Sequence, residues 1–321
     1  MLAKRNRSIA KNGKKGGGRR PLVSLLIVAI LIVAVFFILE KLKKPAPKKP
    51  AALPPPVAHK KPQVKISKPL VIHKQYSAAA KPPPPEKYPE VKPPANLPPI
   101  GRGTVAIIID DMGSSVREVE ELMAIDVPLT FSIIPGLGKD REVAEVARQR
   151  SYEVMIHVPM EPRDYPQRRL EKNGLLTAES NAEIHGQVSE YLRDVPFAVG
   201  ANNHMGSRFT EDAEKMQAAL TPLSGRGFYF VDSMTTPKSV GTKVAKGLGM
   251  RTASRNVFLD NTQDVDAIRK QIRQLAQLAS KRGSAIGICH PHKATIQALA
   301  AELPVLHKQG ITFVYASKLA R

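Results

Sequence analysis

The sequence contains very little cysteine, and its first hundred residues contain very few acidic side chains. Its 321 residues include a single cysteine, Cys289. One thiol excludes an intramolecular disulfide framework and any zinc finger built on cysteines. Residues 1–100 carry only three acids, Glu40, Glu86 and Glu90, so most of the formal net charge of +21 belongs to this segment.

Residues 101–321 are close to balanced, with an excess of about three positive charges. The sequence pI of about 10.1 therefore describes the N-terminal part of the chain. A domain that binds nucleic acid needs a basic face, and the balanced composition does not favour one. The sequence predicts no nucleic-acid partner.

Residues 21–39 contain no charged side chain. A helix of this length spans ~28 Å, close to the hydrocarbon thickness of a bilayer. A cleavable signal peptide is the alternative, but no small-x-small cleavage site follows, and Lys41, Lys43 and Lys44 come directly after the apolar run. Residues 1–20 are more strongly basic. The positive-inside rule then predicts a cytoplasmic tail at 1–20, a bacterial inner-membrane anchor at 21–39 and a periplasmic globular domain.

Residues 40–100 are rich in proline, lysine and alanine, with proline runs at 54–56 and 82–85. Such a segment cannot bury a core, and we expect an extended, disordered linker. At ~3.1 Å per residue it could reach on the order of 100 Å. A ligand for an SH3-type domain is the alternative to this spacer.

From residue 101 onward, apolar runs alternate with amphipathic ones. The predicted strands are 105–110, 129–134, 153–158, 198–203, 228–231, 251–258, 285–289 and 312–315. The predicted helices are 116–123, 141–149, 179–192, 212–223, 240–247, 264–281 and 293–309. This alternation predicts an α/β fold with a parallel sheet, closed into a (β/α) barrel or open and doubly wound. No Gly-x-Gly-x-x-Gly turn follows the first strand to support a dinucleotide site.

Asp110 and Asp111 end the first predicted strand. Two carboxylates beside a buried strand are costly unless a partner or a metal uses them. One of them could instead cap the next helix, but Ser115 and Glu118 already have the spacing of a capping box. The chemistry suits one carboxylate as metal ligand and the other as general base toward a water molecule.

Histidines also follow three later strands, at His157, His204 and the pair His290 and His292. Each has an ordinary structural interpretation: a core histidine at 157, a polar turn at 204, and a helix N-terminus at 290–292. In a parallel sheet, however, all these strand ends meet at one edge. Oxygen and nitrogen ligands favour a Zn²⁺ site, with Mn²⁺, Co²⁺ or Ni²⁺ as alternatives.

Two further residues are candidates for a supporting role. Asp232 follows the strand 228–231 and could orient a histidine or Arg208, or cap the next helix. Arg208 could neutralise an acid or orient a substrate carbonyl, and a structural ion pair is an equal alternative.

Together these motifs resemble the polysaccharide deacetylase superfamily. The resemblance rests on Ile109-Asp110-Asp111 and on the segments 128–131 and 152–157. Segments 202–207 and 290–292 are similar to its divergent branch, over roughly residues 103–318. The resemblance implies a distorted (β/α) barrel of about seven strands. It also implies metal-assisted hydrolysis of acetyl groups on a carbohydrate polymer.

The resemblance also assigns roles to residues. Asp110 corresponds to the base, Asp111 to a metal ligand and His157 to the first histidine of a His-x-x-x-His motif. Glu161 stands where the second histidine of that motif is expected. Either Glu161 supplies an oxygen ligand or His204 completes the site from the neighbouring strand, and we favour His204.

The late Leu-x-His motif of the superfamily matches residues 288–290 and makes His290 the general acid, with His292 as a supporting group. The Arg-x-Pro-Tyr segment of the superfamily is absent, and Arg208 is only a loose counterpart.

The sequence therefore predicts a membrane-anchored, metal-dependent deacetylase of an envelope carbohydrate polymer, with peptidoglycan as one candidate. A non-catalytic glycan-binding or scaffold protein on a similar barrel is the alternative. A metal-dependent hydrolase of another bond, such as a phosphodiester, is a weaker one.

Overall fold

The computed structural model describes residues 101–321. The predicted cytoplasmic tail, membrane anchor and linker at 1–100 lie outside the described residues. Among the helices within 101–321, none is both long enough and apolar enough to cross a bilayer.

Parallel pairing joins the strands into one sheet. Eight of them follow one another in the order β6-β5-β4-β3-β2-β1-β8-β7, and β9 also pairs with β1. The strands are β1 (Gly103–Met112), β2 (Thr130–Ile133), β3 (Glu153–Met160), β4 (Gly200–Met205), β5 (Tyr229–Asp232), β6 (Thr252–Ser254), β7 (Val257–Phe258), β8 (Ser284–Cys289) and β9 (Ile311–Phe313).

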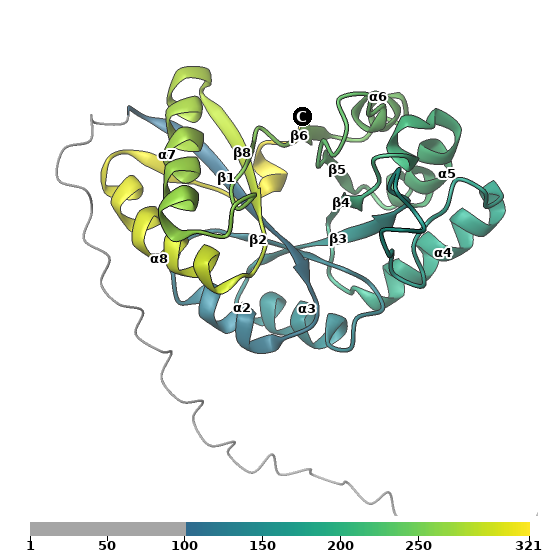
Figure 1. Cartoon of the computed structure of the whole chain (residues 1–321), viewed down its shortest axis with the longest axis horizontal. Helices are drawn as coiled ribbons and strands as arrows, with labels where there is room; N and C mark the ends of the chain where they lie inside the picture. The colour runs from purple at the N-terminus through teal and green to yellow at the C-terminus, as the bar shows by residue number, and fades with distance from the viewer. Residues whose placement is uncertain (1–100) are drawn as a thin grey trace, which may run out of the picture. The chain divides into compact units, whose positions relative to one another are not determined.

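The sheet curves into a half-barrel that its hydrogen bonds do not close (Figure 1). The two ends of the strand order, β6 and β7, pair only with β5 and β8. The expected barrel of about seven strands is therefore wrong in its closure and its count, although the parallel α/β class is confirmed.

The predicted strand 251–258 is in fact two strands, because the chain crosses between the two ends of the sheet within it. The Arg255 backbone N–H donates to Asp232 O on the β5 side (2.9 Å). The next residue, Asn256, bonds to Ile286 of β8 through its own N–H (2.9 Å) and through its side-chain oxygen (2.7 Å). We call this crossing, residues 255–256, the seam.

The helices lie on the outside of the curved sheet (Figure 1). They are α2 (Val116–Met123), α3 (Asp140–Gln149), α4 (Asn181–Asp194), α5 (Ala213–Ser224), α6 (Gly241–Gly247), α7 (Val265–Arg282) and α8 (Lys293–Lys308), with short 3₁₀ turns at Phe209–Glu211 and Ala316–Lys318. All seven predicted helices are confirmed to within two residues at each end.

Two apolar clusters explain why the strands are buried on both faces. Ile107 and Ile109 of β1 point outward into the larger cluster beneath the helices. Ala106 and Ile108 alternate with them and point into the half-barrel. Because side chains alternate along a strand, the next inward position is Asp110. The same periodicity that builds the interior therefore places an acid at its mouth.

The opposite end of the interior is closed by a polar floor. One carboxylate oxygen of Glu153 accepts hydrogen bonds from the Tyr229 hydroxyl (2.8 Å), the Thr130 hydroxyl (3.0 Å) and the Ser317 backbone N–H (3.1 Å). These bonds hold the C-terminal turn against the sheet. The last residue, Arg321, exchanges two backbone hydrogen bonds with Thr252 of β6 (2.9 and 3.1 Å).

The N-terminal caps of the helices differ in one respect from the sequence prediction. Ser115 is the N-cap of α2, but its side chain makes no capping hydrogen bond, so the predicted capping box is wrong. A true capping box lies at the start of α4, where Ser180 and Glu183 bond reciprocally. Helices α5 and α7 are capped by the carboxylates of Asp212 and Asp264.

A buried ion cluster joins the two longest helices, α7 and α8. The Glu302 carboxylate, 2% exposed, binds Arg269 Nε (2.6 Å) and Arg273 Nη2 (2.8 Å). Removing these charges from water costs free energy, and the attraction between the partners offsets that cost. Loss of either partner would leave an unpaired charge in the core.

Candidate metal centre

The site begins where β1 ends. Asp110 points into the half-barrel mouth and is buried. Alternation alone would send Asp111 to the opposite face, but its backbone has a left-handed φ of 57°. This conformation is uncommon for a residue with a side chain, and such residues cluster at functional sites. Here it accompanies an Asp111 carboxylate that faces the ends of β3 and β4.

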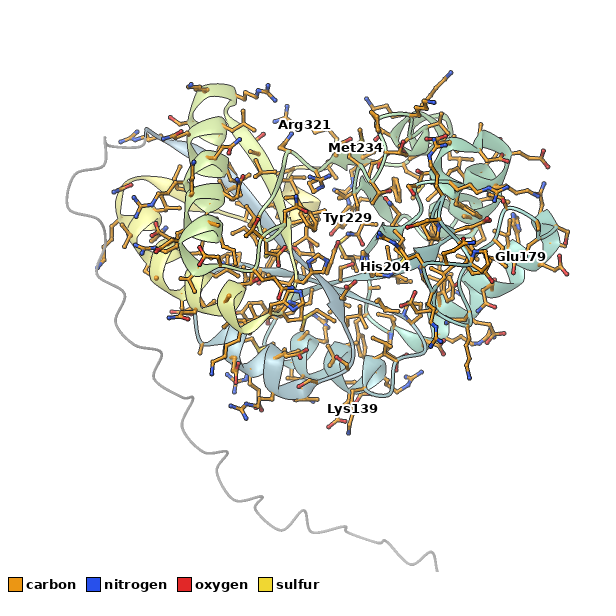
Figure 2. The ribbon with its side chains drawn as sticks, in the orientation of Figure 1. Lys139, Glu179, His204, Tyr229, Met234 and Arg321 are labelled. Atoms are coloured by element: carbon orange, nitrogen blue, oxygen red, sulfur yellow. The ribbon has the colours of Figure 1, made fainter. Side chains whose placement is uncertain are left out.

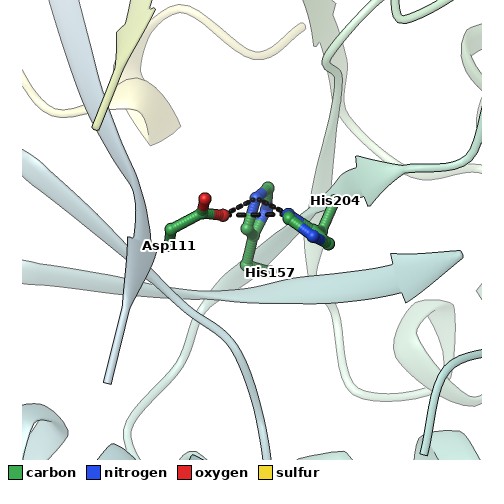
Figure 3. Close-up of side chains that lie close together, drawn as sticks. All are labelled: Asp111, His157 and His204. Atoms are coloured by element: carbon green, nitrogen blue, oxygen red, sulfur yellow. Dashed lines mark hydrogen bonds and ion pairs between the residues drawn. The ribbon is translucent and has the colours of Figure 1, made fainter. Parts of the chain in front are cut away.

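Three side chains meet at this point: Asp111 from β1, His157 from β3 and His204 from β4 (Figure 3). Asp111 Oδ1 lies 3.2 Å from His157 Nε2 and 2.8 Å from His204 Nδ1. The two ring nitrogens are 3.2 Å apart. Figure 2 places His204 near the centre of the molecule, whereas Lys139 lies at its periphery.

The size of this triangle fits a tetrahedral metal ion. Ligands about 2.1 Å from a tetrahedral centre are separated by roughly 3.4 Å, close to the observed separations of 2.8–3.2 Å. Asp111 Oδ1 is buried and has no hydrogen-bond partner among the described residues, although two imidazole nitrogens lie within 3.2 Å of it. The donors therefore face one another in a way that a cation would satisfy.

The electrostatics of the group also favour a positive charge. Burial alone would raise the pKa of Asp111, but the two histidines hold it well below its usual range. Burial alone would lower the pKa of His157, but the charges of Asp110 and Asp111 and the hydrogen bonds with Asp111 and Asn202 together outweigh it and raise the pKa. A buried imidazole that favours its cationic form reports a negative potential at the site.

Sequence reasoning missed Asn202, which connects the other parts of the site. Its side-chain oxygen accepts from the Ser132 hydroxyl (2.6 Å) and from His157 Nδ1 (2.7 Å), and its Nδ2 donates to Asp110 Oδ1 (2.8 Å). With Nδ1 of His157 serving as the donor, Nε2 keeps its lone pair toward Asp111 and His204. Asn202 therefore orients a candidate ligand and the candidate base together.

Asp110 has the environment expected of a general base. Burial raises its pKa, and the charges of His157 and His290 and the hydrogen bond from Asn202 oppose this rise only in part. Asp110 Oδ2 lies 3.5 Å from His157 Nε2, at the edge of the metal-ligand triangle. A raised pKa brings a carboxylate closer to the proton affinity that a base needs near neutral pH.

His290 approaches the triangle from β8, with its Nε2 3.7 Å from Asp111 Oδ2. Sequence reasoning missed its partner, Asp260, because that residue follows β7 on an irregular segment. Asp260 accepts from the His290 backbone N–H (2.7 Å) and the Thr295 hydroxyl (2.9 Å) and contacts His290 Nδ1 (3.2 Å). Burial opposes a charged imidazole, but the Asp260 hydrogen bond and the charges of Asp110 and Asp111 raise the pKa of His290 to about 9.

His292 lies beside this pair but is exposed. The ligand atoms of Asp260, His290 and His292 come within 4.8 Å of one another. Because both oxygens of the Asp260 carboxylate already have partners, on His290 and Thr295, we interpret Asp260 as the residue that orients His290.

Glu161 and Arg208 lie together, away from the triangle. Glu161 Oε2 accepts two hydrogen bonds from Thr177, from its backbone N–H (2.6 Å) and its hydroxyl (2.7 Å), and Oε1 pairs with Arg208 (3.0 Å). These bonds occupy the carboxylate, so the geometry favours His204 over Glu161 as the third member of the group. The Arg208 side chain is 57% exposed and makes the structural ion pair that the sequence left open.

Asp232 faces away from the site, because the inward positions of β5 are Tyr229 and Val231. Its carboxylate accepts from the Ser239 hydroxyl (2.6 Å) and the Met234 backbone N–H (2.8 Å). The structure therefore gives Asp232 the role of holding the segment before α6, and does not bring it to a histidine or to Arg208.

Glu171, also missed by sequence reasoning, lies on the long loop after β3. Its Oε2 is 3.6 Å from His204 Nε2, on the side of the ring opposite Asp111. A carboxylate in this position can orient a ligating imidazole. No strand or helix pattern marks Glu171, so the sequence held no signal for it.

The parallel half-barrel and the Asp–His–His group at the carboxyl edge of its sheet define a protein of the polysaccharide deacetylase superfamily. Residues 107–320 match the family described as divergent polysaccharide deacetylase. The chain belongs to this family, which confirms the resemblance found in the sequence.

Several bacterial proteins are similar to this chain. YibQ, an uncharacterized protein of Escherichia coli K12, is 36% identical over 221 residues, which cover 69% of this chain and 68% of YibQ. An uncharacterized protein of Haemophilus influenzae is 35% identical over 199 residues, or 62% of this chain and 70% of that protein. The crystal structure of an uncharacterized protein from Agrobacterium tumefaciens C58 shares the fold, with a TM-score of 0.65 and 22% identity over 68% of this chain and 90% of that one.

Proposed function

We propose that this protein is a metal-dependent deacetylase that removes acetyl groups from a carbohydrate polymer of the bacterial envelope. The observation that carries the proposal is the Asp111, His157 and His204 triangle, with Asp110 and His290 at its edge. Membership of the divergent polysaccharide deacetylase family supports the reaction type. Peptidoglycan remains the first candidate substrate.

Asp111, His157 and His204 would hold the ion, and nitrogen and oxygen donors at these separations favour Zn²⁺. A bound Zn²⁺ would supply Lewis acidity, which polarises an acetyl carbonyl and makes a water molecule more acidic.

The protein's own groups would then move the protons. Asp110, held by Asn202, would accept the proton of the attacking water. The Asp260 hydrogen bond and the nearby acids favour the protonated imidazole of His290, which would donate its proton to the departing amine or alcohol. Asp260 would keep the imidazole oriented during this transfer.

The uncharged segment 21–39 and the proline-rich segment 40–100 support a periplasmic location on an inner-membrane anchor. A spacer on the order of 100 Å would let the domain reach a polymer away from the membrane surface.

The test is acetate release from peptidoglycan by the full-length protein with added Zn²⁺. We expect Asp110→Asn to retain Zn²⁺ while its rate falls by about 10²–10⁴-fold, the usual contribution of a positioned general base. Asp164→Asn is the matched control, because Asp164 is an exposed acid paired only with Arg168.

Full activity in Asp110→Asn would show that this mechanism is wrong. Zn²⁺ binding without acetate release from any acetylated glycan would favour the glycan-binding scaffold. Hydrolysis of a phosphodiester to a phosphomonoester and an alcohol would favour the other hydrolase.

A further inference from the structure

Arg255 lies at the seam and has no role in the mechanism proposed above. Its backbone is bonded to the end of β5, and the next residue is bonded to β8. The seam crosses from one end of the sheet to the other, and Arg255, which directly follows β6, is close to the carboxyl edge of the sheet that carries the metal site.

The Arg255 guanidinium is held in place by neutral groups. Its Nε donates to Ser233 O (2.7 Å) and its Nη2 to Met234 O (3.0 Å). Its Cζ atom lies 5.1 Å from the centre of the Phe258 ring, and the same ring contacts the His290 ring at 5.4 Å. Phe258 therefore separates the guanidinium from the candidate general acid by one side chain.

These contacts fix the position of the cation without neutralising it. Among residues 101–321, no carboxylate oxygen pairs with Arg255 within 4 Å. The charges of Asp110 and Asp232 act on it from a greater distance. Ser233, whose carbonyl holds the guanidinium, also has a buried hydroxyl with no partner in the described chain.

A preorganised guanidinium beside an active site suits an anionic ligand group. Arginine has five N–H donors, and the two backbone carbonyls use two of them. The remaining N–H groups form a planar fork, which matches a carboxylate in geometry and charge. The acetyl group that the metal site would bind is neutral, so the anion must belong to another part of the substrate.

We propose that Arg255 binds a carboxylate carried by the carbohydrate, so that the substrate is an acidic polymer. The proposal rests on the proposed function only in taking a carbohydrate as the ligand. Binding and acetate release can therefore be measured separately.

The experiment measures binding of two probes to the full-length, Zn²⁺-loaded protein by calorimetry. One probe is a tetrasaccharide of alternating N-acetylglucosamine and N-acetylmuramic acid, whose lactyl groups carry carboxylates. The other is its methyl ester, which has nearly the same shape and no charge. We expect the acid to bind at least about tenfold more tightly than the ester, as charge-assisted hydrogen bonds would produce.

Arg255→Gln should bind both probes equally, and Arg255→Lys should keep part of the preference because it keeps the charge but not the fork. Arg251→Gln is the matched control. Arg251 also lies over an aromatic ring, that of Tyr229 (5.8 Å), and donates to the Ser317 carbonyl (2.9 Å), but it does so at the floor. This variant should keep the full preference.

Equal binding of both probes by the wild type, or no binding of either, would overturn the proposal. A preference that persists in Arg255→Gln would also overturn it, because the carboxylate would then be bound elsewhere, for example by the metal. A preference that depends on Arg255, without acetate release, would support this subsite while contradicting the deacetylase function.

Discussion

Replacing Asn202 tests whether one buried amide organises the site. Asn202→Leu keeps the approximate size of the side chain and removes all three of its hydrogen bonds, to Ser132, His157 and Asp110. Each buried partner left unsatisfied costs about 1–3 kcal/mol. Because the Ser132 hydroxyl can rotate toward another acceptor, two partners remain unsatisfied, and we expect a total loss of about 2–6 kcal/mol in the free energy of unfolding.

The larger functional effect should be on metal binding. Asn202 keeps the proton of His157 on Nδ1, and without it the imidazole can place that proton on Nε2, the nitrogen that faces Asp111. Loss of a residue that orients a metal ligand typically lowers metal affinity by 10–100-fold. Asn202→Asp keeps the acceptor for His157, so it should retain more Zn²⁺ affinity than Asn202→Leu.

Two measurements check this reasoning: competitive Zn²⁺ titration and long-range ¹⁵N–¹H NMR of the His157 tautomer. The matched control is Asn203→Leu, because Asn203 is also buried on β4 and its side chain bonds to the backbone of Ser233 and Met205 instead. The control should lose stability but keep the tautomer. Wild-type Zn²⁺ affinity and an unchanged tautomer in Asn202→Leu would refute the reasoning.

Three further predictions concern stability and protonation. Glu302→Gln should lower the free energy of unfolding by about 3–5 kcal/mol in urea titrations, because it leaves the buried Arg269 with only the exposed Asp266 as a counter-charge. In the metal-free protein, His290 has a folded-state pKa of about 9. Its stabilising contribution, up to about 3 kcal/mol, should be complete below pH ~6.5 and disappear as the pH rises to about 9. Asp260→Asn should weaken this dependence. Asp232→Asn should loosen the segment before α6 and leave Zn²⁺ affinity unchanged.

Each of these has an outcome that contradicts it. A Glu302→Gln protein as stable as the wild type would mean that the arginines find other partners. An NMR titration that gives His290 the same pKa in Asp260→Asn would remove Asp260 as the cause of the raised value. Loss of Zn²⁺ from Asp232→Asn would show that Asp232 contributes to metal binding.

Much of the site could be predicted because parallel strands share one carboxyl edge. Asp110, His157 and His290 all follow recognisable apolar strands, and the structure brings them together. The distances along the sequence between these three residues did not indicate that their side chains would meet. The periodicity of the strands and the parallel topology were sufficient.

What could not be predicted depends on side chains whose role is set by neighbouring strands. Asn202 falls within the predicted strand 198–203, but only the neighbouring strands of the folded sheet place its side chain between Asp110 and His157. Asp260 belongs to no regular element, and only the tertiary fold brings it to His290. The division of residues 251–258 into two strands depends on Asn256, whose side chain replaces a ladder bond to β8.

The strand order, which ends at β6 and β7, leaves the half-barrel with two sheet edges that a closed barrel would not have. Exposed edges can pair with strands of other copies and start aggregation. In this fold, β7 is only two residues long, and the backbone of Thr252 on β6 is already paired with the C-terminal residue Arg321, which lies beside that edge (Figure 1). The C-terminal segment and the shortness of β7 therefore protect the chain from edge-to-edge association without closing the sheet into a full barrel.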